Sequence, residues 1–128
     1  MPGVKEWLKK ASNDLKASKK LSDDDETLDC SVFHAHQCAE KTFKAFIVCI
    51  QDEVPRTHDL GALVVYCGEV DPVLMTLQDA SKSLNPYGLN SRYPNDNFYV
   101  DKQIAEMAVV MAEKILITIQ RKLAEKRA

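Results

Sequence analysis

The stretch that most constrains the fold of this chain runs from Leu28 to Ile50 and reads LDCSVFHAHQCAEKTFKAFIVCI. Its apolar residues recur at steps of three and four, which places them on one face of an α-helix, and no alternation of period two competes with this pattern. These residues are Leu28, Val32, Ala35, Ala39, Phe43, Phe46 and Ile50. Gln37, Lys41 and Lys44 lie at i, i+4 and i+7 on the opposite side. We therefore expect a central helix that buries one face and presents polar groups on the other.

Four other segments show helical spacing of apolar residues. They are Val4–Leu21, Leu60–Gly68, Pro72–Leu84 and, approximately, Val100–Glu125. Thr57 or Asp59 is expected to cap the second of these helices, Gly68 to end it, and Asp71-Pro72 to open the third. The segment from Asn85 to Asn97, rich in Asn and Pro, is expected to be a loop.

The chain is therefore predicted to be all-α, a single domain over residues 1–128, folded as an antiparallel bundle of three long and two short helices with a long loop before the last helix. In the last helix we expect the buried stripe to comprise Val100, Ile104, Met107, Met111 and Ile115. Further apolar residues lie elsewhere around this helix, which indicates that it is either central or shared with a second subunit.

Composition excludes some classes of function. The net charge of -2 provides no overall attraction to nucleic acid, so no DNA partner is predicted. No apolar run is long enough to span a membrane, and residues 1–10 lack the apolar segment of a signal peptide. Without a secretion signal, the four cysteines are expected to be reduced thiols in a cytoplasmic protein.

Four segments in order, FHAHQCAEKTFKAFIV, PRTHDL, LNPY and SRYP before a long last helix, resemble the HEPN (higher eukaryotes and prokaryotes nucleotide-binding) family. Ala11 and Asp14 in the first helix also match the family pattern. The resemblance spans nearly the whole chain. It implies a compact helical bundle that dimerises, and many prokaryotic members act beside a minimal nucleotidyltransferase in a toxin–antitoxin-like pair.

Some members of the family are metal-independent ribonucleases with an arginine followed four to six residues later by a histidine. This sequence departs from that pattern, because Arg56 is only two residues before His58 and no histidine follows Arg92. The resemblance therefore places the chain with the stand-alone members proposed to bind nucleotides, and no catalytic residue is predicted.

Three groups of residues are candidates for ligand binding. Lysines suit phosphate, and helix N-termini bind anions. Tyrosine stacks on bases, and arginine binds phosphate with two parallel hydrogen bonds. The groups are Gln37, Lys41 and Lys44 on the central helix; His58 with Asp59 at a helix start; and Tyr87, Arg92 and Tyr93 in the long loop.

Each group also has a structural interpretation. The first is a solvated helix face with Lys44 paired to Glu40. The second is a helix cap with His58 packed upon it, which gives Asp59 a supporting role. In the third, the tyrosines pack the loop against the bundle and Arg92 forms an ion pair with Asp14. Asp14 lies at the edge of the apolar stripe of the first helix, where a buried acid needs a partner.

Metal and acid–base sites are less well supported by the spacing. Cys30 and Cys38 lie about 12 Å apart along a helix, too far to share one zinc ion, so no metal is predicted. His36 and Glu40 form an i, i+4 pair, but no nucleophile or second base accompanies them.

Our hypothesis is a non-catalytic HEPN domain that forms a homodimer, binds a nucleotide such as ATP or an RNA, and has a separately encoded nucleotidyltransferase as partner. No other cofactor is predicted. One alternative is a ribonuclease that uses Arg92 with a histidine from another helix or subunit. The other is a protein-interaction module with no nucleotide ligand.

Overall fold

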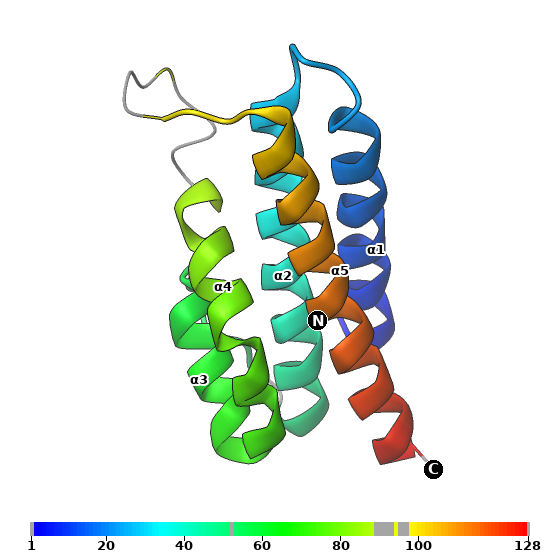
Figure 1. The fold of residues 1–128 in the computed structure, drawn as a ribbon. Coiled ribbons are helices and arrows are strands. Elements are labelled where there is room, and N and C mark those ends of the chain that lie inside the picture. Colours follow the sequence, from blue (N-terminus) through cyan, green and yellow to red (C-terminus); the bar gives the residue numbers. More distant parts are fainter. Residues whose placement is uncertain (1, 52, 89–93, 95–97, 128) are drawn as a thin grey trace.

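The computed structural model describes residues 2–51, 53–88, 94 and 98–127. The helices are α1 (Val4–Leu21), α2 (Leu28–Ile50), α3 (Leu60–Val70), α4 (Gln78–Leu84) and α5 (Lys102–Arg127), with short 3-10 helices η1 (Pro72–Leu77) and η2 (Asn85–Gly88). The described residues contain no strand, so the all-α prediction is confirmed. Helices α1, α2 and α5 run the length of the bundle, while α3 and η1–α4 form a shorter hairpin beside α2 (Figure 1).

Helix α2 is central, because it contacts α1, α3, α4, α5 and η2. Its predicted apolar stripe forms much of the core, with Phe43 and Phe46 fully buried. Helices α1 and α2 approach closely where two serines meet: the Ser18 hydroxyl donates to the Ser31 carbonyl and the Ser31 hydroxyl to the Ser18 carbonyl, both at 2.7 Å. Small side chains permit this approach, and the reciprocal hydrogen bonds satisfy the buried hydroxyls.

One prediction about the shorter helices was wrong, and another was confirmed in its bounds but not in its helix type. Gly68 does not end α3, which continues to Val70. Gly68 lies inside the helix and is packed so closely against Met75 of η1 that a Cβ would overlap its side chain. The third predicted helix is divided: it begins as η1, with the Asp71 carboxylate accepting from the Val73 N–H at 3.2 Å, and becomes α-helical at Gln78.

The predicted stripe of α5 was only partly right: Ile115 is buried, Val100, Ile104 and Met111 are half-buried against the core, and Met107 is exposed. The face against the core instead consists of Ala105, Ala108, Ala112, Ile115, Leu116, Ile119 and Leu123. Alanine side chains are small, so α5 packs close to the neighbouring helices. The core face therefore contains the buried alanines, and the large apolar residues are not all on it. Larger apolar residues of α5 consequently face outward, among them Met107 and Val110.

Candidate functional site

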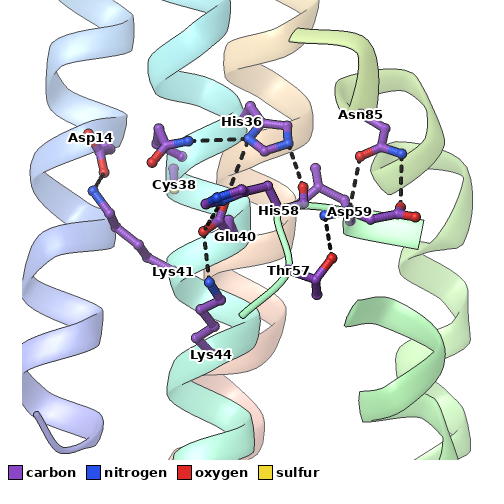
Figure 2. Close-up of polar contacts among 12 residues, drawn as sticks. Asp14, His36, Cys38, Glu40, Lys41, Lys44, Thr57, His58, Asp59 and Asn85 are labelled. Carbon is purple, nitrogen blue, oxygen red and sulfur yellow. Dashed lines mark hydrogen bonds and ion pairs between the residues drawn. The ribbon is translucent and has the colours of Figure 1, made fainter. Parts of the chain in front are cut away.

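A buried carboxylate on α2, that of Glu40, is the centre of the most extensive polar cluster among the described residues (Figure 2). The Lys44 ammonium lies 2.9 Å from one of its oxygens, one turn along the helix. Nδ1 of His58 lies 3.0 Å from both oxygens. The side chains of Lys44 and Glu40 are only 8% and 6% exposed, so this is a buried ion pair, which is costly unless such hydrogen bonds satisfy it.

His58 belongs to the connector between α2 and α3 and has an exposed ring. A carboxylate only accepts hydrogen bonds, so Nδ1 carries the proton that His58 donates to Glu40. The side chain is 79% exposed, which leaves Nε2 as the ring nitrogen available to solvent or a ligand. A carboxylate that orients an imidazole through Nδ1 is the arrangement used to position histidines for proton transfer or anion contact.

His36, in contrast, is buried and structural. Burial lowers its pKa, an effect that the nearby carboxylate of Glu40 opposes. Its Nε2 lies 3.1 Å from the His58 carbonyl, an acceptor only, so Nε2 carries the proton and His36 donates. Gly88 of η2 packs on the same ring, since a Cβ there would lie 2.5 Å from Nε2. His36 thus joins α2 to both the connector and η2.

A network around the start of α3 completes the cluster. The Asp59 carboxylate caps the helix by accepting from the N–H groups of Gly61 and Ala62, at 2.9 and 3.3 Å. Asn85 accepts from the Leu60 N–H and donates to Asp59, both at 2.9 Å. Of the two predicted N-caps, Thr57 and Asp59, the residue that caps the helix is Asp59. The segments PRTHDL and LNPY, distant in sequence, therefore meet against the middle of α2.

The polar face of α2 does not form one surface. Lys41 points toward α1, where its ammonium lies 2.6 Å from Asp14 (Figure 2). His34 contacts the same carboxylate at 2.9 Å, so Asp14 has the partners that its position required. Lys44 instead pairs with Glu40. The structural interpretation of this helix face included that pair, but it placed Lys44 in solvent, whereas the side chain is buried. Gln37 lies near His36, with its amide nitrogen 3.5 Å from Nδ1.

Of the three candidate ligand-binding residues in the loop, Tyr87 lies apart from this cluster, and Arg92 and Tyr93 lie outside the described residues. Tyr87 lines a groove between α4 and α5, where its ring meets Phe98 edge to face at 5.8 Å between centroids. Burial, with a contribution from Asp101, raises its pKa. Arg92 and Tyr93 lie outside the described residues, so the proposed clamp and the bridge from Arg92 to Asp14 stay predictions.

A hollow of about 410 Å³ next to Lys44 contains residues that the sequence analysis did not assign to a site. It is lined by Trp7, Lys44, Glu53, Val54, Pro55 and Arg56. The Lys44 ammonium is 5.9 Å from the centre of the Trp7 ring, a cation–π distance. Nε1 of Trp7 is buried and has no hydrogen-bond partner among the described residues. Trp7 belongs to α1, and Arg56 belongs to the PRTHDL segment of the connector between α2 and α3.

Other chemistry finds little support among the described residues. No group of three or more His, Cys, Asp or Glu side chains is placed to hold a metal ion. Burial raises the pKa of the Cys38 and Cys67 thiols to about 12, so both stay protonated. None of the described helices is both long enough and apolar enough to cross a membrane.

Comparison with known proteins gives a family match, and solved structures also resemble this chain. The HEPN domain family matches residues 4–122. The crystal structure of TT1696 from Thermus thermophilus is 25% identical with a TM-score of 0.83, and the match covers 95% of this chain and 99% of that one. ST0689, an archaeal HEPN homologue, is 23% identical with a TM-score of 0.76, covering 95% and 98%. No curated protein matches.

Proposed function

Because the chain belongs to the HEPN domain family, we propose that it is a nucleotide- or RNA-binding domain that works without catalysis, as the partner of a separately encoded minimal nucleotidyltransferase in a toxin–antitoxin-like pair. We propose further that it forms a homodimer. The observation that best supports nucleotide binding is the hollow lined by Trp7, Lys44 and Arg56.

The lining of the hollow matches the chemistry of a nucleotide. The indole of Trp7 offers a face on which a base can stack. Arg56 is exposed and can bind phosphate oxygens with two parallel hydrogen bonds. Glu53 supplies an acceptor for ribose hydroxyls or a base amino group. The volume of about 410 Å³ lies within the range of small-ligand sites.

The buried cluster supports the hollow from beneath. Lys44 is held between Glu40 and the Trp7 ring, so its charge has a defined place at the wall of the hollow. His58 is two residues beyond Arg56, and its solvent-facing Nε2 donates to a phosphate chain when the imidazole is protonated. Because Lys41 is paired with Asp14, we expect Arg56 and not Lys41 to contact phosphate.

Calorimetric titration with ATP, GTP and a short single-stranded RNA tests the proposal. We expect Arg56→Ala to weaken binding at least tenfold, a loss of about 1.4 kcal/mol. Arg121→Ala is the matched control, because Arg121 is also exposed but lies on α5 and does not line the hollow. If a folded wild-type protein binds none of these ligands below about millimolar concentration, the nucleotide proposal fails and a protein-interaction module is favoured.

The His58–Glu40 pair favours a second candidate, a ribonuclease with an atypical active site. An imidazole oriented by a buried carboxylate can transfer protons, and Arg56 could stabilise charge on phosphate. RNA cleavage abolished in His58→Ala but retained in His34→Ala would support this candidate. Purified protein that leaves RNA intact would exclude it.

The nucleotidyltransferase partner rests on the family resemblance. Purification of the tagged chain from its native host, followed by mass spectrometry, tests it directly. We expect a nucleotidyltransferase at a stoichiometric level, and its absence from a purified complex would contradict the pairing.

A further inference from the structure

Helix α5 exposes large apolar side chains on the side away from the core. Met107, Val110 and Ile117 are 51%, 65% and 39% exposed and share one face of the helix at helical spacing. The side toward the core has alanines at Ala105, Ala108 and Ala112 instead. In Figure 1 no described helix covers this outer side of α5. A helix with large apolar side chains on both sides can pack against a second partner.

The apolar surface continues from this face into a groove. A hollow of about 300 Å³ between α4 and α5 is lined by Ser83, Tyr87, Ile104, Met107, Ala108 and Met111. Met107 belongs both to the groove and to the exposed face, so the two form one surface. The Met111 and Met107 side chains are flexible and polarisable, which suits an adaptable protein contact.

The charges on this face are arranged for pairing with a copy of itself. Glu106 lies four residues before Val110 and Lys114 four residues after it. Both are exposed, and neither has an ion-pair partner among the described residues. If a two-fold axis passes beside Val110, the second helix runs antiparallel and each residue before Val110 faces one the same distance after it. Glu106 then meets Lys114 of the second copy, and this pair occurs twice.

A parallel arrangement would instead bring Glu106 against Glu106 and Lys114 against Lys114. Like charges in contact oppose association, whereas complementary charges fix the register of an interface. The outer face of α5 is thus apolar at its centre and oppositely charged on the two sides of that centre, the anatomy of a self-complementary interface.

We infer that the outer face of α5 is the homodimer interface, in which two copies pack antiparallel with Val110 near the two-fold axis and Glu106 paired to Lys114 of the second copy. This inference rests on the homodimer in the proposed function and specifies its surface. It does not depend on nucleotide binding.

Sedimentation velocity over about a hundredfold range of protein concentration tests the inference. We expect the wild type to dimerise and Val110→Lys to sediment as a monomer, since lysine favours helix more than valine does and the side chain is exposed. Val73→Lys is the matched control, because Val73 is 54% exposed on η1 and away from this face. A monomeric wild type, or a dimer insensitive to Val110→Lys, would overturn the inference.

A charge exchange tests the register. Glu106→Lys and Lys114→Glu each place like charges together twice, so each is expected to weaken the dimer. Combining them restores opposite charges and should restore dimerisation. Two weakened single variants with no recovery in the double variant would overturn the antiparallel pairing. Titration of monomeric Val110→Lys with ATP separates this result from the nucleotide proposal: retained binding supports a dimer face distinct from the nucleotide site.

Discussion

Replacement of Lys44 by methionine should destabilise the protein strongly. Lys44 and Glu40 form a buried pair at 2.9 Å, and the substitution leaves the Glu40 carboxylate buried without its ammonium partner. Breaking a buried pair on one side typically costs 3–5 kcal/mol. The His58 Nδ1–H still contacts Glu40 after the substitution and His58 is open to water, so we expect the lower end, about 3 kcal/mol.

The double variant Glu40→Gln with Lys44→Met should be far less destabilised, by about 1 kcal/mol. It removes both buried charges, and a glutamine oxygen still accepts from His58. The free energies of unfolding come from urea titration of the wild type, both single variants and the double variant, which together form a double-mutant cycle. For a domain of this size, 3 kcal/mol corresponds to a fall of about 12 °C in the melting temperature.

Lys41→Met is the matched control, because Lys41 is a lysine of the same helix paired to Asp14 but more exposed than Lys44. We expect a smaller loss of about 1–2 kcal/mol, because the Lys41 side chain is 26% exposed and His34 still contacts Asp14 after the substitution. A cost for Lys44→Met no greater than that for Lys41→Met, with a coupling energy near zero in the cycle, would refute the argument that Glu40 depends on Lys44.

Three further predictions concern the contacts around Glu40. Gly88→Ala places a methyl group against the His36 ring and should cost about 1–3 kcal/mol in urea titration; an unchanged midpoint would contradict that close packing. Asp59→Ala removes the cap of α3 and should lower the free energy of unfolding by about 1–2 kcal/mol. Asp79→Ala is the control: Asp79 is exposed, and its replacement should change that free energy little. Burial lowers the pKa of His36 below its usual 6.5, so the unfolded chain binds the proton more readily and the contribution of His36 to stability is lost as pH falls below about 6.5. His36→Gln should therefore show a smaller loss of stability between about pH 7 and pH 5 than the wild type, and an equal loss would exclude His36 as a source.

Predictions from local pattern succeeded where one physical signal dominated. The bounds predicted for α1, Val4–Leu21, are those observed, because its apolar repeat is followed by an acidic, polar break. The capping role of Asp59 followed from the preference of Asp for the position before a helix. Gly68 shows the limit of such rules, because glycine also permits close helix packing, and only the neighbouring Met75 reveals this.

The candidate site was only partly predictable, because its contacts join residues far apart in sequence. The pairing of Lys44 with Glu40 follows from helical spacing, but the addition of His58 to Glu40 requires the connector to fold back along α2. Lys41 and Lys44 looked equivalent on the helix, yet one meets Asp14 on α1 and the other is buried beside Trp7.

The amino-acid sequence by itself determined the helical character of the chain and the position of its central helix, because these depend on periodicity and on local residue preferences. Its four motif segments, in order, gave the resemblance to the HEPN family. The tertiary structure alone decided which side of α5 is buried, since apolar residues lie around most of that helix and only the neighbouring helices distinguish alanine from methionine at the core. It also decided which partners the charged side chains have. Asp14 pairs with Lys41 because α1 packs against α2, and His36 and Glu40 contact His58 because the connector folds back along α2. Spacing along the chain does not specify these contacts.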